Sequence, residues 1–415
     1  MSMADDNTGI DRNSGENEPI PTLQRRRRVL KTLGGGAAVG LTGLSGCLGG
    51  GGSDDTPTEA DDDGGDDDDG GSTDTATPTD MGGDLADELI VQMSGGHYLD
   101  SYKEKVFSKF EEEYGVTITV NLVGNQFDGY SKIKSGQSDT DVTITSASTL
   151  YMGTSEDVWA PIDPAEIDNW GSMLDTFRNP VYDPGESVHA VPTVYGTIGM
   201  AYNRDELGEQ DSWAACWDTA NEGRITMEGF GFVRVFTTAL YLGMDPNNIG
   251  ADSSYDEGIQ KIWDSVREQK PLVTKYWSTG DEHVRLFSQE QALAGEAWGG
   301  RIFGAVQDGY DFLDYVVPKE GAYGWSDNWV MVKGLSEKKR RTALTYFNFL
   351  LEEDVIVPLT EMLGYPPATD ATSDGIENLY DYDPSGGERL TFLNPGYKDE
   401  HNDAWSQTWE EIQAG

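Results

Sequence analysis

The sequence predicts an α/β fold of two lobes, with a ligand cleft between them and hinge strands that cross from one lobe to the other. From Leu89 onward, short apolar strands alternate with amphipathic helices, which is typical of α/β architectures. Residues 89–415 are too many for one small sheet, yet no Gly/Ser/Pro linker divides them into separate domains. Two lobes that share the chain satisfy both conditions, and α/β folds bind ligands where the ends of their strands meet.

The first strand is expected at Leu89–Met93, a short apolar run. The helix that follows places its large apolar side chains on one face. These are Tyr102, Val106, Phe107, Phe110 and Tyr114. Gly115 is expected to end this helix, because glycine readily adopts the left-handed conformation of a helix C-cap.

The remaining elements are predicted from the alternation of side chains along strands and from the spacing of apolar residues along helices. β-branched or alternating runs predict strands at 116–123, 141–146 and 194–202. Apolar residues at helical spacing predict helices at 234–243, 255–269 and 337–352. Because helices separate the strands along the chain, the sheets are expected to be largely parallel.

The first 47 residues have the pattern of an export signal. Arg26-Arg27-Arg28-Val29-Leu30-Lys31 matches a twin-arginine motif, and the apolar run 32–46 is too short to span a bilayer, which needs about 20 residues. The run ends at Leu44-Ser45-Gly46-Cys47, which resembles the lipobox of lipoproteins. Residues 1–47 are therefore expected to be a twin-arginine signal, with Cys47 lipidated at the outer face of the membrane.

Residues 48–88 are rich in Gly, Asp and Thr and contain neither Lys nor Arg, so a disordered acidic tether is expected. The whole chain has 74 acidic and 29 basic residues and a net charge of −45, which argues against binding to nucleic acid. Such an acidic coat indicates a salt-adapted, haloarchaeal-like protein. In molar salt the Debye length is about 3 Å, so ligand selectivity must come from inside a pocket.

Motifs for catalysis or metal binding are missing from the sequence. It has no P-loop, no His-Glu-x-x-His and no Gly-x-Ser-x-Gly, and its four histidines lack metal-ligand spacing. Asp381 and Asp383 begin half of a calcium loop, but Phe392 replaces the Glu at its twelfth position, so a turn is expected. We therefore expect no cofactor, no metal and no enzyme activity.

Several segments resemble the spermidine/putrescine-binding family of ABC-importer solute-binding proteins. Val316-Val317-Pro318-Lys319-Glu320-Gly321 and Trp325-Ser326-Asp327-Asn328 are similar to one family segment. The similarity continues in 343–351, in Asp354-Val355 and Gly364-Tyr365-Pro366, and upstream in 192–197 and 295–300. It implies a type II periplasmic-binding-protein fold. Lobe 1 would comprise 89–197 and 326–372, and lobe 2 would comprise 198–325 and 373–415, with crossovers near 197, 326 and 372.

The same resemblance implies the site residues. Trp298, Trp325 and Asp327 fall on family positions that hold a polyamine. An ammonium over an indole face gains about 0.5–2 kcal/mol, and a carboxylate adds a charge-assisted hydrogen bond. Four more ligand-binding positions are implied by similarity or lie at the expected strand ends: Ser146, Tyr195, His97 and Tyr98.

One departure from the family leaves the ligand open. Where the family offers an acidic pair, this chain has 226–234, in which only Glu228 can substitute, and Arg234 would favour an anion or a zwitterion if it faced the cleft. The other reading is that Glu228 and Arg234 simply pair with each other. A polyamine is the first candidate and another small solute, a mono-amine, zwitterion or anion, the second.

The function expected is that of a monomeric, lipid-anchored binding protein that delivers its solute to ABC permease subunits. The alternative from another class is a secreted lyase or hydrolase that uses Glu228 and Asp327 as acid and base.

Overall fold

A mixed ten-stranded sheet runs through the part of the chain that the computed structural model describes, residues 84–383 and 385–415. Neighbouring strands follow the order β2-β1-β3-β9-β4-β7-β5-β6, while β8 pairs with β4 and β10 with β9. The strands are β1 (Glu88–Ser94), β2 (Thr117–Val123), β3 (Val142–Thr145), β4 (Ala190–Asn203), β5 (Ile225–Glu228), β6 (Val273–Trp277), β7 (Ala294–Trp298), β8 (Leu313–Val316), β9 (Ala322–Met331) and β10 (Leu390–Phe392). All four predicted strands are confirmed, and the fourth extends from 194–202 to the whole of β4.

The directions of the strands differ between the flanks and the centre of the sheet. β1 is parallel to β2 and β3, and β5 is parallel to β6 and β7. β9 is antiparallel to β3 and β4, and β4 is antiparallel to β7 and β8. The expectation of largely parallel sheets is therefore right for the flanks and wrong for the centre. The long strands β4 and β9, which run in opposite directions, form that centre.

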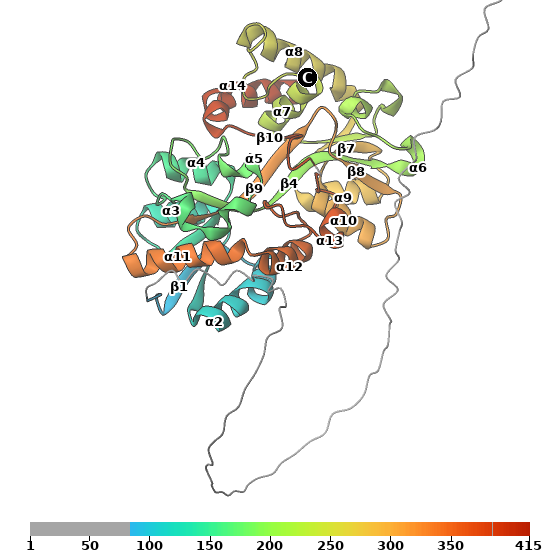
Figure 1. The fold of residues 1–415 in the computed structure, drawn as a ribbon. Coiled ribbons are helices and arrows are strands. Elements are labelled where there is room, and N and C mark those ends of the chain that lie inside the picture. The colour runs from blue at the N-terminus through green and yellow to red at the C-terminus, as the bar shows by residue number, and fades with distance from the viewer. Residues whose placement is uncertain (1–83, 384) are drawn as a thin grey trace, which may run out of the picture. The chain divides into compact units, whose positions relative to one another are not determined.

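Helices cover the sheet, with α2, α11 and α12 around β1 and with α7, α8 and α14 at the other end of the strand order (Figure 1). The helices are α1 (His97–Tyr102), α2 (Ser108–Tyr114), α3 (Gln126–Lys134), α4 (Ala147–Ser155), α5 (Asp175–Arg178), α6 (Arg204–Leu207), α7 (Gly231–Tyr241), α8 (Tyr255–Gln269), α9 (Gly280–Ser288), α10 (Gly299–Gln307), α11 (Glu337–Leu350), α12 (Glu353–Leu363), α13 (Asp374–Glu377) and α14 (Pro395–Ala414). The three predicted later helices correspond to α7, α8 and α11. The prediction for α8 matches at both ends.

The expected first helix is present as α1 and α2, joined by a π-helical turn at Lys103–Phe107. Tyr102, Val106 and Phe110 are buried in the main hydrophobic core, as the periodicity predicts. Gly115 ends the helix with φ of 67°, the left-handed conformation expected of this C-cap.

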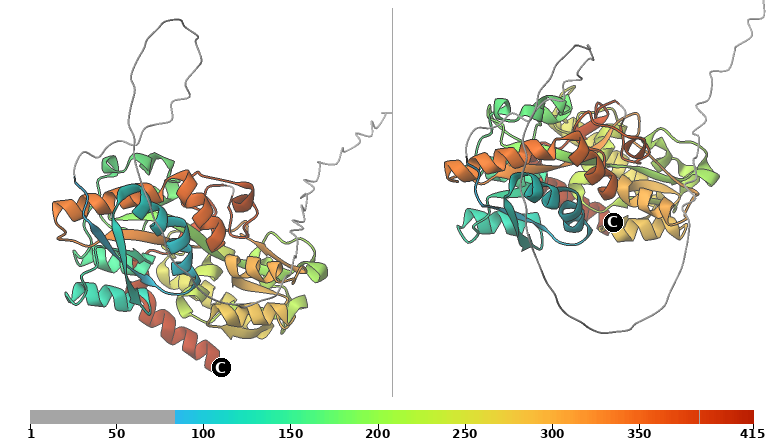
Figure 2. Two further views of the ribbon diagram at one scale, coloured as in Figure 1. Left: turned by 90° about the horizontal axis from the view of Figure 1, so that it is seen from below. Right: turned by 60° about the horizontal axis from the view of Figure 1, so that its bottom comes forward.

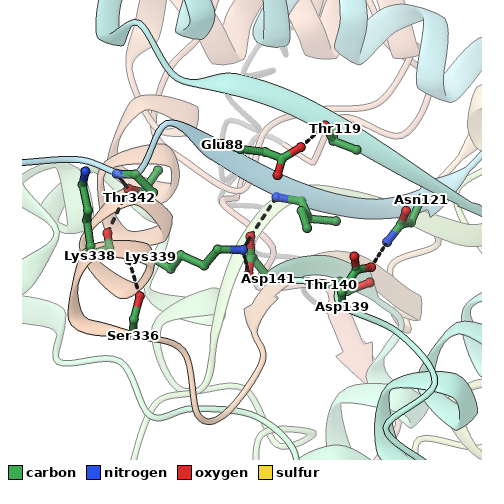
Figure 3. A network of polar contacts seen from close by, with 12 residues as sticks. Glu88, Thr119, Asn121, Asp139, Thr140, Asp141, Ser336, Lys338, Lys339 and Thr342 are labelled. Atoms are coloured by element: carbon green, nitrogen blue, oxygen red, sulfur yellow. Dashed lines mark hydrogen bonds and ion pairs between the residues drawn. The ribbon is translucent and has the colours of Figure 1, made fainter.

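A buried carboxylate connects helix α11 to the strands β1 and β3. Asp141, which precedes β3 and is almost fully buried, accepts hydrogen bonds from the backbone N–H of Ile90 and from Lys339 Nζ, which lies 2.8 Å from its Oδ2 (Figure 3). Ser336 caps the N-terminus of the same helix through the N–H of Lys339. The pair fixes α11 against the first strands of the sheet.

The predicted signal at 1–47, including Cys47, and the tether up to residue 83 lie outside the described residues. The end of the predicted tether needs correction, because Ala86 is buried and donates its N–H to Thr342 Oγ1, and Glu88 already belongs to β1. Among the described residues, no helix has the length and apolar character that a membrane crossing requires.

The described residues belong to one compact unit. The predicted crossovers at 197 and 326 fall inside β4 and β9, which pair along most of their length, so the division into lobes stays a prediction. The C-terminal helix α14 begins beside α4, where Gly396 packs against the hydroxyl of Tyr151, and continues past α7 (Figure 2).

The close packing of β7 on β5 yields a testable consequence. A Cβ atom on Gly295 would lie 1.7 Å from the carbonyl oxygen of Thr226 in β5, so Gly295→Ala must push the two strands apart. We expect a loss of about 3 kcal/mol in the free energy of unfolding, measured by urea denaturation in high salt. Gly124→Ala, whose new methyl group would meet nothing within 4 Å, is the control. Equal stability of the two variants would contradict this packing.

Candidate functional site

The register of the central strands places three predicted site residues on one face of the sheet. Trp298 on β7 pairs with Ile198, whereas Trp325 and Asp327 on β9 pair with Gly196 and Val194. Since paired residues share a face and alternate residues of β4 return to the same face, all three side chains project to one side. The sheet thus brings together the two indoles and the carboxylate that the sequence singled out.

A cavity of about 270 Å³ lies against Asp327. It is lined by Met93, Ser94, Tyr98, Val123, Gln126, Thr143, Ile144 and Asp327. Most of these residues lie at the ends of β1, β2 and β3 or just after them, where α/β folds place their ligand contacts. Its volume lies near the lower end of the usual range for ligand pockets, so it suits a small solute.

Asp327 is held by donors from two helices. The hydroxyl of Tyr98 in α1 donates a hydrogen bond to Asp327 Oδ2, and Gln126 at the start of α3 also bonds this carboxyl. Burial raises the pKa of Asp327 to about 6, and the bonds from Tyr98 and Gln126 limit that rise. At neutral pH the group therefore presents a negative charge to the cavity.

The two indoles are partly buried, and each packs against another ring. Trp325 stands edge-on to Tyr365, with ring centroids 4.8 Å apart. Trp298 contacts Trp277 and His283, each at a centroid distance of 5.8 Å. Both indoles are thus oriented by aromatic neighbours.

Several charged groups act on the hydroxyl of Tyr365. Burial raises the pKa of its hydroxyl, the charges of Asp381 and Asp327 raise it further, and the charge of Arg301 lowers it. Arg301 lies in the first turn of α10, and its Nε is beside the same glycine, Gly280, that the Trp298 ring touches. The site therefore contains a guanidinium as well as carboxylates.

Three of the predicted residues do not join this group. His97 is exposed, and its Nε2 lies 3.1 Å from the carbonyl oxygen of Met362. The hydroxyl of Ser146 caps α4 in a capping box with Thr149. Tyr195 pairs with Ser326, so it projects to the face opposite Trp325 and packs on Phe177 with centroids 5.1 Å apart. The placement of Tyr195 in the cleft is therefore wrong, because one step along β4 reverses the face.

Glu228 and Arg234 are placed in neither of the two ways that the sequence left open, in which Arg234 faces the cleft or the two side chains pair with each other. Arg234 is fully buried and forms its ion pair with Glu296 of β7, so it does not face a cleft. The N–H of Glu228 donates to Glu296 Oε2 at 2.7 Å, and its own carboxyl is buried. Burial and the nearby charge of Glu296 raise the pKa of Glu228 to about 8. Glu228 is thus neutral at pH 7 and offers no charge to a second amine.

Three residues of the site were missed. Gln126 follows β2 directly, so the rule that ligands bind at strand ends would have found it. Tyr365 stands within the Gly-Tyr-Pro motif but was not assigned a role. Asp381 bonds Thr197, which lies 184 residues away in the sequence, so no local pattern could reveal it. Within the described ranges, no group of three His, Cys, Asp or Glu side chains could hold a metal ion.

A family model described as bacterial extracellular solute-binding protein matches residues 105–384. The chain is similar to the putrescine-binding periplasmic protein SpuD of Pseudomonas aeruginosa, 23% identical over 345 residues that cover 77% of this chain and 91% of that protein. It is also 23% identical to the putrescine-binding periplasmic protein PotF of Escherichia coli, over 74% of this chain and 87% of PotF.

A solved structure with the same fold is the spermidine/putrescine ABC transporter substrate-binding protein PotD of Streptococcus pneumoniae. The two share 20% sequence identity with a TM-score of 0.69, over 79% of this chain and 99% of that one. At this identity the likeness establishes the fold, a periplasmic-binding-protein architecture.

The buried ion pair behind the site predicts a large stability effect. Glu296→Gln leaves the guanidinium of Arg234 buried without a counter-charge, so we expect a loss of about 3–5 kcal/mol in the free energy of unfolding. Glu206→Gln is the matched control, because its pair with Arg224 is roughly two-fifths exposed and should contribute below about 1 kcal/mol. Urea denaturation followed by tryptophan fluorescence compares them. A cost for Glu296→Gln no greater than the control's would show that Arg234 is not paired as described.

Proposed function

The chain belongs to the family of bacterial extracellular solute-binding proteins, and from this premise we propose that it captures a small organic amine outside the cell and delivers it to the permease of an ABC importer. The observation that carries the proposal is the carboxylate of Asp327, which borders a small cavity and shares a face of the sheet with Trp325 and Trp298. The first candidate ligand is a polyamine such as putrescine or spermidine.

The chemistry of the site fits one alkylammonium group. Such a group has three N–H donors, and Asp327 can accept one of them in a charge-assisted bond beside Tyr98 and Gln126. The indole of Trp325 offers a face for cation–π contact worth about 0.5–2 kcal/mol. The apolar residues of the cavity, among them Met93 and Ile144, suit a methylene chain. Both polar contacts strengthen when closure of the lobes expels water.

We also propose that the protein acts by binding alone, without covalent chemistry, since its family consists of transporter binding proteins. The twin-arginine signal and the lipobox at Cys47 support export followed by lipid anchoring, with residues 48–83 as the tether. In this scheme the two lobes close around the ligand as a monomer, and the permease recognises the closed form.

A zwitterion is the second candidate, and Arg301 is the observation that favours it. Its guanidinium lies beside Trp298 and is about half exposed, and its one ion-pair partner among the described residues is Asp281, with Oδ1 at 3.6 Å. Glu228, in contrast, supplies no charge for a second ammonium group. A ligand with an ammonium at Asp327 and a carboxylate toward Arg301 would satisfy both ends of the site.

A thermal-shift assay of the purified protein in high salt tests the function and separates the two ligands. Putrescine and 4-aminobutyrate are the matched probes, because they have four-carbon chains that end in an amine and in a carboxylate, respectively. A ligand at 100 times its Kd stabilises the folded state by about 2.7 kcal/mol, so we expect putrescine or spermidine to raise the Tm by several degrees. A larger shift with 4-aminobutyrate would favour the zwitterion. No shift with any amine, mono-amines included, would refute the proposal.

The role of Asp327 predicts the effect of its removal. Asp327→Asn keeps the shape but loses the charge, so we expect the affinity for the amine to fall about 30- to 100-fold in isothermal titration calorimetry. Asp175→Asn is the control, since that side chain is 92% exposed and remote from the cavity. Because the pKa of Asp327 is about 6, the affinity of the native protein should fall below pH 6, whereas that of Asp327→Asn should stay flat.

The stability of the empty protein should change in the opposite direction with pH. The folded state binds the proton of Asp327 more tightly than the unfolded chain does. Its contribution to stability is therefore greatest below pH 4 and is lost as the pH rises through 6. A native affinity that is unchanged from pH 8 to pH 5 would exclude Asp327 as the ammonium partner.

A further inference from the structure

Asp381 is a buried carboxylate at the point where β7 ends and α10 begins. Its Oδ1 accepts a hydrogen bond from Thr197 Oγ1 at 2.9 Å, and its Oδ2 accepts one from the N–H of Gly300 at 3.1 Å. The backbone of Thr197 and the hydroxyl of Tyr315 also bond the carboxyl. The side chain is completely buried and, in the part of the chain described, forms no ion pair.

Three glycines leave the room that this arrangement needs. A Cβ atom on Gly299 would lie 1.6 Å from Asp381 Oδ1, and one on Gly300 would lie 2.5 Å from the ring of Tyr365. A Cβ atom on Gly196 would lie 2.3 Å from Cζ2 of Trp325 and 2.9 Å from Asp381 Oδ2. The carboxylate and the Trp325 ring therefore fill neighbouring parts of the same space above β4.

Asp381 is unsuited to bind the ligand itself. Four donors from the protein already surround its two oxygens, which is about the number that a carboxylate can accept. The donors belong to β4, β8 and the first turn of α10, so the carboxylate links three elements that meet at the site. Thr197 and Trp325 are also at or beside the two predicted crossovers, where lobe movement would be centred.

We propose that Asp381 is a positioning residue, which links Thr197 of β4 to Gly300 of α10 and thereby holds Trp325 and the turn after Trp298 in the geometry that receives the ligand. The inference rests on the proposed function. Without the carboxylate, the Trp325 ring can move into the vacated space over Gly196 and the first turn of α10 loses its acceptor. The binding face is then no longer pre-arranged, and affinity falls.

The test measures the affinity of the full chain for putrescine, or for 4-aminobutyrate if that is what the native protein binds, by isothermal titration calorimetry in high salt. Asp381→Asn should weaken binding at least tenfold, because the amide cannot accept from all four donors. Gly299→Ala should do the same by displacing the carboxylate. Gly304→Ala is the control, since it lies on the same helix and its methyl group would meet nothing within 4 Å, so its affinity should stay within twofold.

A double-mutant cycle distinguishes positioning from a general loss of structure. In an Asp381→Ala background the carboxylate is gone, and the nearest remaining neighbour of a Cβ atom on Gly299 is Tyr315 Cε1 at 2.9 Å. Gly299→Ala should therefore cause a much smaller further loss of affinity there than it causes alone. The Tm without ligand shows whether each variant is folded.

Two results would overturn this inference and leave the proposed function standing. One is native affinity in Asp381→Asn despite a lowered Tm. The other is a loss of affinity in the double variant that equals the sum of the two single losses in binding free energy. If the native protein binds neither probe, the proposed function fails and the inference fails with it.

Discussion

The antiparallel pairing of β4 with β9 is the constraint on which the site depends. Its register decides which side chains of the two strands share a face, and a slip of one residue would move Trp325 and Asp327 to the other side of the sheet. The register shifts between Pro192 and Val194, which leaves Thr193 as the extra residue of a bulge. A proline is acceptable in this central strand because it lies beside that bulge, where the ladder is interrupted.

Three acidic residues near this face show how burial gives the same chemical group different roles. Asp327 borders the cavity and is bonded by two donors among the described residues, so its carboxylate retains acceptor capacity for a ligand. Asp381 is enclosed by four donors and acts within the protein. Glu228 lies close to the carboxylate of Glu296, whose partner is Arg234, and its raised pKa leaves it neutral. The acidic residue counts of the sequence could not distinguish these cases, because the donors around each group come from distant segments.

Helices and strands with a regular spacing of apolar residues could be predicted from the sequence. The placement of single side chains in the folded protein could not. Helix α8 matches its prediction at both ends because Ser254 caps it and its apolar positions recur at helical spacing. Trp298, Trp325 and Asp327, which the motif context singled out, share one face of the sheet, and their contact with a ligand stays a prediction. Tyr195 was misplaced because motif similarity gives a position along a strand but not the face. Asp381 was read as a turn residue because the elements that bond it, β4 and α10, are distant from it in the sequence.

Two of the helices that follow strands have N-terminal N–H groups that are bonded by side chains of the protein. Helices that follow strands direct their N-terminal N–H groups toward the ligand end of the sheet, and such groups attract anions. At α4 the hydroxyl of Ser146 accepts the N–H of Thr149, and at α10 the carboxylate of Asp381 accepts the N–H of Gly300. Among the described residues that line the cavity, Asp327 is the one that has a charge. The charge of Arg301, in the first turn of α10, acts on the Tyr365 hydroxyl in the opposite sense to the charges of Asp327 and Asp381. Under the proposed function, a carboxylate at the far end of the ligand would therefore lie toward Arg301.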